Sequence, residues 1–532
     1  MSHSIDKTLR LLGKSKNKAA ARLLETALSS SDEVVRQLAS QELVSSRGVR
    51  GLVDLIGRVD HLDDASLALF DKQRDKMASA LRSAILSQDP RLNRNAFRII
   101  LSRQYFEILP TLLRILIESG DDLDADSPVP EVIDQLSLQY VQALDGGRQR
   151  RYLRETVLPT ILRALSPLLL GFHRDDPPLI PMLFLRLYPF LPVEYLDTAK
   201  ILRNSSLPVY RVLQQILLSG DIPTACDFIR YCFNNPDSPP LAQIAFSQRM
   251  DVPFLERIFE SLDESVSPDF MDNLKRMQSI EWLDKLRVVL DQLEDTSQKG
   301  LVTIIRFAHL TTERRQSLLM EIFRYGKPAG RLAALNLLTL SSGKQIDQLV
   351  WQACDDNDPG VQSAALKQLR HRELPDASIK ILQLADSPHA LVRETVQSLM
   401  PDFRLDRFLD TFDQMSEEQR SMTFKLIKKI DPNLNEQIRR QLLLGEPIQQ
   451  AKSLLCIEYG EMVPNFEDEL CTILMRAETP AMRIKVAKLL AAGRRELSRG
   501  TLVQAFHRDT DPGVRAAAKQ SLENRPMPWE VK

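Results

Sequence analysis

Residues able to catalyse a reaction or hold a metal ion form no recognisable pattern in this chain. The seven histidines are scattered and none is followed by glutamate: His3, His61, His173, His309, His371, His389 and His507. A zinc-binding helix needs two histidines one turn apart, and a phosphate-binding loop needs closely spaced glycines before a lysine. The chain has neither motif, nor the Gly-x-Ser-x-Gly turn of a nucleophilic serine. We therefore expect no catalytic residue, no metal, no cofactor and no enzymatic activity.

Basic side chains gather at both ends of the chain and could bind an anionic partner. Residues 7–22 hold six basic and no acidic side chains, and residues 476–525 hold eleven basic and five acidic ones. Either segment suits phosphate or an acidic protein, although no aromatic residues alternate with the charges as in a single-strand-binding surface. The interpretation we favour is that these charges keep the ends of the molecule soluble. The candidate partner-binding basic patch consists of Lys485, Lys488, Arg494, Arg495 and Arg499.

Size and composition indicate a folded chain with more than one structural unit. Its 532 residues exceed the ~250–300 that one hydrophobic core supports. A net charge of −1 gives no bulk attraction to nucleic acid or to an anionic membrane. The five cysteines lack zinc-binding spacing, which indicates buried, reduced thiols, and we expect a cytoplasmic protein.

The most hydrophobic stretch, residues 179–192, predicts a buried helical hairpin. It contains Arg186 and three prolines, and it is shorter than the ~20 residues of a membrane span. The N-terminal residues lack the apolar run of a signal peptide. We therefore expect no membrane span.

A repeat of about thirty residues runs through the C-terminal part of the chain. Asp358-Pro359-Gly360-Val361 recurs as Asp511-Pro512-Gly513-Val514, with looser copies at residues 388–393 and 480–483. Asp can cap a helix, and Pro fits the first helical turn. Residues four and eight after each anchor are apolar, which predicts a buried stripe along each helix. The anchors are Gly330, Val361, Val392, Met422, Ala451, Met482 and Val514.

A second helix must precede each anchored helix, because two helices of about ten to twelve residues and two short turns fill such a period. The apolar patterns place these partner helices at residues 346–354, 377–385, 405–415, 433–444, 466–476 and 499–507.

The motif Asp-Pro-x-Val-Arg-x-x-Ala-x-x-x-Leu at residues 511–522 resembles the second helix of a HEAT repeat. Residues 32–43 carry a copy with Val35, Arg36, Ala39 and Leu43, and residues 89–100 carry a looser one. The chain is thus similar to the HEAT-repeat, armadillo-type family, and the similarity is strongest over residues 316–524. It implies an all-α solenoid of stacked antiparallel helix pairs.

The resemblance also implies a role for the residue after each anchor, which is basic in five of seven copies. In HEAT-repeat proteins such residues commonly form a ladder with loop aspartates between neighbouring repeats. Binding of a partner is the alternative role for this row. The expected ladder consists of Arg331, Arg393, Arg483 and Arg515 with Asp358 and Asp511.

The middle third departs from the motif but keeps its period. Pro208, Pro223, Pro240, Pro253 and Pro268 lie 13 to 17 residues apart, which predicts one proline at the start of each helix. We therefore expect regular repeats at 1–118, an acidic and glycine-containing loop region with one helix at 119–150, and irregular helix pairs at 151–300. Regular repeats follow at 301–524, with a tail at 525–532.

These patterns favour a non-catalytic scaffold that binds another protein on the concave surface of the solenoid. One alternative is a nucleic-acid-binding protein of the HEAT-like kind that uses its basic terminal repeats. A HEAT-like lyase or another cofactor-binding protein is the remaining alternative, for which the chain carries no specific motif.

Overall fold

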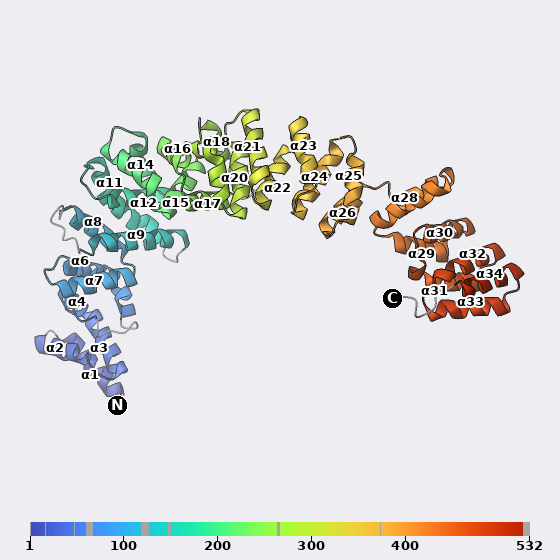
Figure 1. The fold of residues 1–532 in the computed structure, drawn as a ribbon. Helices are drawn as coiled ribbons and strands as arrows, with labels where there is room; N and C mark the ends of the chain where they lie inside the picture. The colour runs from blue at the N-terminus through green and yellow to red at the C-terminus, as the bar shows by residue number, and fades with distance from the viewer. Residues whose placement is uncertain are drawn as a thin grey trace. The chain divides into compact units, whose positions relative to one another are not determined.

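The computed structural model describes residues 2–15, 17–46, 48–59, 67–118, 127–146, 150–262, 266–372 and 374–524. These residues form helices and connecting loops without a β-strand. The chain divides into two compact units, Met1–Arg315 and Gln316–Lys532 (Figure 1). In each unit consecutive helices pack as pairs, which confirms the predicted all-α fold of stacked pairs.

The first unit begins with short helices that pack on one another in sequence order. α1 lies against α3, α4 lies against α6, and α6 lies against α7. Asp89 caps α7 through the amides of Arg91 and Leu92, and Pro90 occupies its first turn. The helices are α1 (Ser2–Lys14), α2 (Lys18–Ala27), α3 (Glu33–Ser46), α4 (Val49–Ile56), α6 (Arg74–Ile85), α7 (Pro90–Ser102) and α8 (Leu109–Glu118).

The rest of the first unit is built from two layers of helices. One layer runs through α9, α12, α15, α17 and α20, each in contact with the next, and α14 and α16 belong to the other layer. The predicted proline positions are confirmed, because a proline lies in the first turn of each of α14 to α18. The helices are α9 (Val129–Gly146), α11 (Leu158–Leu170), α12 (Leu179–Leu187), α14 (Pro208–Ser219), α15 (Ile222–Phe233), α16 (Pro240–Gln248), α17 (Val252–Glu260), α18 (Pro268–Arg276) and α20 (Asp295–Phe307).

One expectation for this part of the chain needs correction. Residues 179–192 do not form a hairpin, because α12 continues into a single 3-10 turn, Tyr188–Phe190. Within the expected loop region at 119–150, α9 ends at Gly146, residues 147–149 lie outside the described part of the chain, and Arg150 begins another helix. The acidic residues 119–126 lie outside the described part of the chain, as does the tail at 525–532. No described helix combines the length and apolarity needed to cross a membrane.

The second unit is more regular and also has two layers. The motif-bearing helices contact one another in order: α22 (Pro328–Leu337), α24 (Pro359–His371), α26 (Ala390–Leu399), α28 (Glu417–Ile430), α30 (Pro447–Tyr459), α32 (Pro480–Leu489) and α34 (Pro512–Glu523). All six predicted partner helices are present: α23 (Lys344–Ala353), α25 (Ala377–Gln383), α27 (Leu405–Thr411), α29 (Leu434–Leu444), α31 (Glu467–Arg476) and α33 (Glu496–Arg508). α21 (Thr312–Tyr325) links the two units in sequence.

Two of the seven anchors are wrong. Val361, Val392 and Val514 are buried as expected, but Met422 is 71% exposed and Ala451 is also exposed. The residues in the equivalent position, three after the helix cap, are Gln419 and Gln449, whose side chains close capping boxes. Because Gln419 and Gln449 are polar, an alignment that looks for apolar residues placed the anchors at the next apolar positions, Met422 and Ala451.

Candidate functional site

The predicted ladder arginines occupy the fourth position of their helices and bind the loop that precedes the helix. Arg393 donates to the carbonyls of Ser387 and Pro388 at 2.7 and 2.9 Å, and Arg515 donates in the same way to Asp509 and Thr510. These arginines therefore satisfy carbonyl groups that the end of the preceding helix leaves unpaired.

Arg331 and Arg483 also form ion pairs between neighbouring repeats, but their partners are not the predicted aspartates. Arg331 binds both oxygens of Asp356 at 2.7 and 2.9 Å, and Arg483 binds both oxygens of Asp509 at 2.9 and 3.0 Å. Such bidentate pairs fix the orientation of both side chains. The surrounding protein tends to raise the pKa of Asp509 by desolvation, but hydrogen bonds from Arg483 and from the amide of Asp511 outweigh this and lower it.

Asp358 and Asp511 have a different role from the one expected. Each is a helix cap whose side chain accepts the amide of the residue three positions on, Val361 or Val514, at 3.0 Å. A carboxylate that accepts a hydrogen bond from its own helix is unavailable to the arginine of the previous repeat. The aspartate two residues earlier, Asp356 or Asp509, therefore pairs with that arginine.

An arginine in the fourth position of the helix also binds the preceding loop in repeats where the motif was misaligned or absent. Arg420 on α28 donates to the carbonyl of Phe412 at 2.7 Å, and Arg315 on α21 donates to the carbonyls of Ile305 and Ala308. The apolar alignment missed both residues; counting four positions from each helix cap would have found them. This row serves repeat packing in the described part of the chain.

The structure does not gather the predicted basic patch into one cationic surface. Lys485 on α32 pairs with Glu458 on α30, whereas Arg495 pairs with Asp468 on α31 at 2.7 Å. Arg499 lies 4.0 Å from Glu496. Lys488 is exposed. The amides of Arg494 and Arg495 donate to the buried carboxylate of Glu467 at 2.8 and 2.9 Å. Three of the five cations, Lys485, Arg495 and Arg499, therefore lie beside carboxylates.

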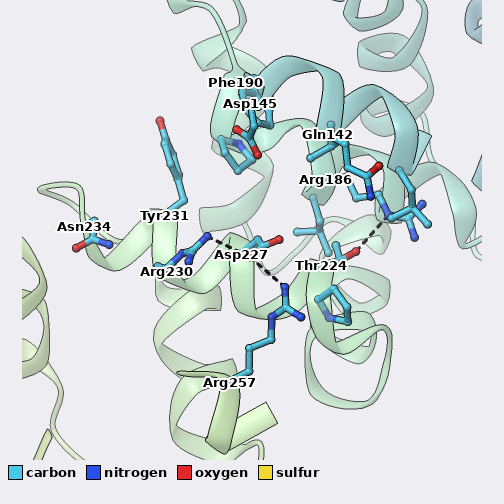
Figure 2. Close-up of a pocket in the computed structure, with 15 residues that line it drawn as sticks. Gln142, Asp145, Arg186, Phe190, Thr224, Asp227, Arg230, Tyr231, Asn234 and Arg257 are labelled. Atoms are coloured by element: carbon cyan, nitrogen blue, oxygen red, sulfur yellow. Dashed lines mark hydrogen bonds and ion pairs between the residues drawn. The ribbon is translucent and has the colours of Figure 1, made fainter. Parts of the chain in front are cut away.

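A groove in the first unit brings together side chains that the sequence analysis did not combine (Figure 2). It is a cavity of about 540 Å³ across the layer of α9, α12, α15 and α17. Its apolar lining includes Leu138, Val141, Pro189, Phe190 and Pro223. Its polar and charged lining includes Gln142, Asp145, Arg186, Thr224, Asp227, Arg230, Tyr231, Asn234 and Arg257. We call this cavity the layer groove.

Arg186 forms the rigid floor of the layer groove. Its side chain is 5% exposed and pairs with Asp134 on α9 at 2.7 Å. It also donates to the hydroxyl oxygens of Ser137 on α9 and Thr224 on α15 at 2.6 and 3.2 Å. Because its guanidinium joins α9, α12 and α15, we assign Arg186 to the structure of the groove. Its position as the single charge in an apolar stretch is the sequence signal that marked it.

Two aromatic side chains, Phe190 and Tyr231, line the layer groove, and Tyr188, which is not part of the lining, contacts Tyr231. Tyr188 packs edge-on against Tyr231 with ring centroids 5.8 Å apart, and it also packs on Phe228 at 5.2 Å. Burial raises the pKa of Tyr188, with smaller contributions from Cys232 and Tyr231. Tyr231 remains partly exposed at the groove.

The cationic end of the layer groove holds two arginines that share one carboxylate. Nη2 of Arg230 and Nη2 of Arg257 lie 3.3 and 3.9 Å from the same oxygen of Asp227. Figure 2 shows the side chains of Arg230 and Arg257 reaching Asp227 from two different helices. Arg230 and Arg257 lie on consecutive helices of one layer and 27 positions apart, close to the repeat period. A search for charges at that period would have paired them.

The five cysteines are buried, and burial makes four of the thiols unreactive. Desolvation raises the pKa of Cys226, Cys354 and Cys456 to about 12 and also raises that of Cys232. Since the thiolate is the reactive form, we expect these four cysteines of the folded protein to resist iodoacetamide at pH 8. Mass spectrometry after alkylation checks this, with guanidinium-unfolded protein as the control that labels fully. Rapid labelling of Cys226 in folded protein would contradict the burial of α15.

Comparison with known proteins adds no family assignment. No family model and no curated protein matches the chain. Among solved structures, Kap121p is 12% identical over 98% of this chain and 73% of its own, with a TM-score of 0.29. Kap121p bound to Nup53p is 13% identical, with coverages of 98% and 54% and a TM-score of 0.30. An engineered protein is 13% identical with a TM-score of 0.17. The chain spans about half to three-quarters of the length of the Kap121p chains, and its solenoid class rests on its own helix pairs.

Proposed function

We propose that this protein is a non-catalytic scaffold that binds another protein through the layer groove. The observation that carries the proposal is that four helices of one layer present their side chains to a single cavity. Gln142, Asn234 and Arg257 are exposed there. Amide and guanidinium groups can bind the backbone and side chains of an extended peptide, and apolar lining can hold its side chains.

The other candidate sites support this choice. In the basic patch, Lys485 and Arg495 are each paired with a carboxylate, which lowers their attraction for a phosphate backbone. In the described ranges, no group of three or more His, Cys, Asp or Glu residues has the arrangement of a metal site. In the layer groove, exposed hydrogen-bonding groups and apolar side chains lie together.

The test is a pull-down with the tagged full chain from nuclease-treated extract of the native cell, quantified by mass spectrometry. Gln142→Trp fills the layer groove without changing its charge, and we expect it to lose a protein that the unmodified chain recovers in near-stoichiometric amount. Gln215→Trp is the matched control, because Gln215 is exposed on α14 in the other layer. It should retain that protein.

Two outcomes would overturn the proposal. Equal recovery by both tryptophan variants would mean that the layer groove is not the binding surface. Recovery of the protein only from a parallel extract without nuclease treatment, or only at low salt, would instead assign the chain to the nucleic-acid-binding proteins.

A further inference from the structure

We infer that the layer groove selects a partner segment in which an aspartate or glutamate is flanked by apolar side chains. This inference rests on the proposed function and specifies the chemistry of the partner. Its basis is the place where Arg230 and Arg257 meet the single carboxylate of Asp227. The partner's carboxylate binds between the two guanidinium groups.

Charge and hydrogen bonding at this place are incompletely matched. Two positive groups face one negative group, and both use the same Oδ1 atom at long distances of 3.3 and 3.9 Å. Each guanidinium has five N–H donors arranged for a planar carboxylate. The side chains of Arg230, Arg257 and Asp227 are 55, 50 and 45% exposed, so an incoming carboxylate can reach them. A second carboxylate would balance the charge and occupy the remaining donors.

The rest of the groove lining argues for a peptide rather than a nucleic acid. Leu138, Pro189 and Phe190 give apolar surface on the side of α9 and α12. Asp145 and Asp227 also line the groove, and these two negative charges would repel a continuous phosphate backbone. The charge of Arg186 is already taken by Asp134. The groove therefore has one cationic end, which suits a single acidic residue with apolar neighbours.

The experiment measures binding of the full chain to fluorescent peptides with a common apolar framework. The peptides differ at one central position, which is Glu in the first, Gln in the second and Lys in the third, and a short single-stranded DNA is the fourth probe. We expect the Glu peptide to bind and the Gln and Lys peptides to bind at least about tenfold more weakly, as the loss of one charge-assisted contact implies.

Variants of the three charged residues should change the affinity in opposite directions. Arg230→Gln and Arg257→Gln should each weaken binding of the Glu peptide about tenfold. Asp227→Asn removes the internal competitor and should strengthen it several-fold, while leaving the Gln peptide unchanged. Arg211→Gln, an exposed arginine on α14, is the matched control and should have no effect. Unchanged thermal unfolding establishes that the variants remain folded.

The outcomes separate this inference from the proposed function. If Gln142→Trp abolishes capture of a protein but the peptides show no preference for Glu, the scaffold function stands and the acidic specificity is wrong. Equal affinity of the Asp227→Asn variant and the unmodified chain for the Glu peptide would also reject the shared-carboxylate site. Preferential binding of the DNA, reduced by Arg230→Gln, would reassign the groove to nucleic acid.

Discussion

Leu490→Asp should destabilise the second unit by about 4 kcal/mol or more. Leu490 is fully buried in the cluster that joins α31, α32, α33 and α34, where it packs among Leu474, Val486, Leu502 and Val514. The change removes a large apolar side chain, which alone costs ~2–5 kcal/mol, and it also leaves a carboxylate in the core without a partner. We expect the helices around residue 490 to lose their protection from hydrogen exchange.

Calorimetry together with hydrogen-exchange mass spectrometry measures this effect, because a chain with two units need not unfold in one transition. Leu497→Asp is the matched control: Leu497 is 53% exposed in the first turn of α33, where a negative charge is tolerated or favourable. The control should change stability by less than ~1 kcal/mol. An unaltered melting curve for Leu490→Asp would show that residue 490 is not in the core.

Gly300→Ala should destabilise the first unit by about 3 kcal/mol, although alanine is the better helix former. Gly300 is buried in α20 where this helix crosses α17. A Cβ atom at this position would lie 2.1 Å from the carbonyl oxygen of Phe259. The obstacle is backbone rather than the end of a flexible side chain, so the two helices must separate. Overpacking of this kind typically costs 1–3 kcal/mol or more, and it outweighs the gain of ~1 kcal/mol in helix propensity.

A second glycine within a helix tests this explanation. Gly500 lies inside α33, and a Cβ atom there would meet nothing within 4 Å. Gly500→Ala should therefore be neutral or stabilise the chain by up to ~1 kcal/mol. The two variants are compared by thermal unfolding, with exchange of the α17 and α20 amides as the local readout. Equal effects of the two substitutions would mean that helix propensity, and not the crossing of α17 and α20, decides the outcome at Gly300.

The helix pairs could be predicted from the sequence because apolar spacing and helix caps repeat along the chain. Asp358 and Asp511 marked the starts of α24 and α34, and the prolines marked the starts of helices in the middle third. The prediction was wrong where Gln419 and Gln449 replace an apolar anchor. In α28 and α30 the capping box determines where the helix begins and therefore which residues face the core. The capping box depends on side-chain hydrogen bonds rather than on hydrophobicity.

The candidate site was harder to predict, because its residues come from four separate helices. Phe190, Asp227 and Arg257 have no common motif, and only the stacking of α9, α12, α15 and α17 brings them to one cavity. The composition of the chain instead marks the basic patch at 485–499. Local counts of lysine and arginine do not reveal where carboxylates from neighbouring repeats will lie, as Asp468 does beside Arg495.

The layer groove extends across three successive junctions between helices, from α9 to α17. A small rotation at each of the three junctions moves one helix relative to the next, and together these rotations change the distance between Asp145 and Arg257. A ligand that contacts both α9 and α17 would therefore restrict the movement of these helices relative to each other. The affinity of the layer groove for its ligand and the resistance of helices α9 to α17 to bending should therefore change together.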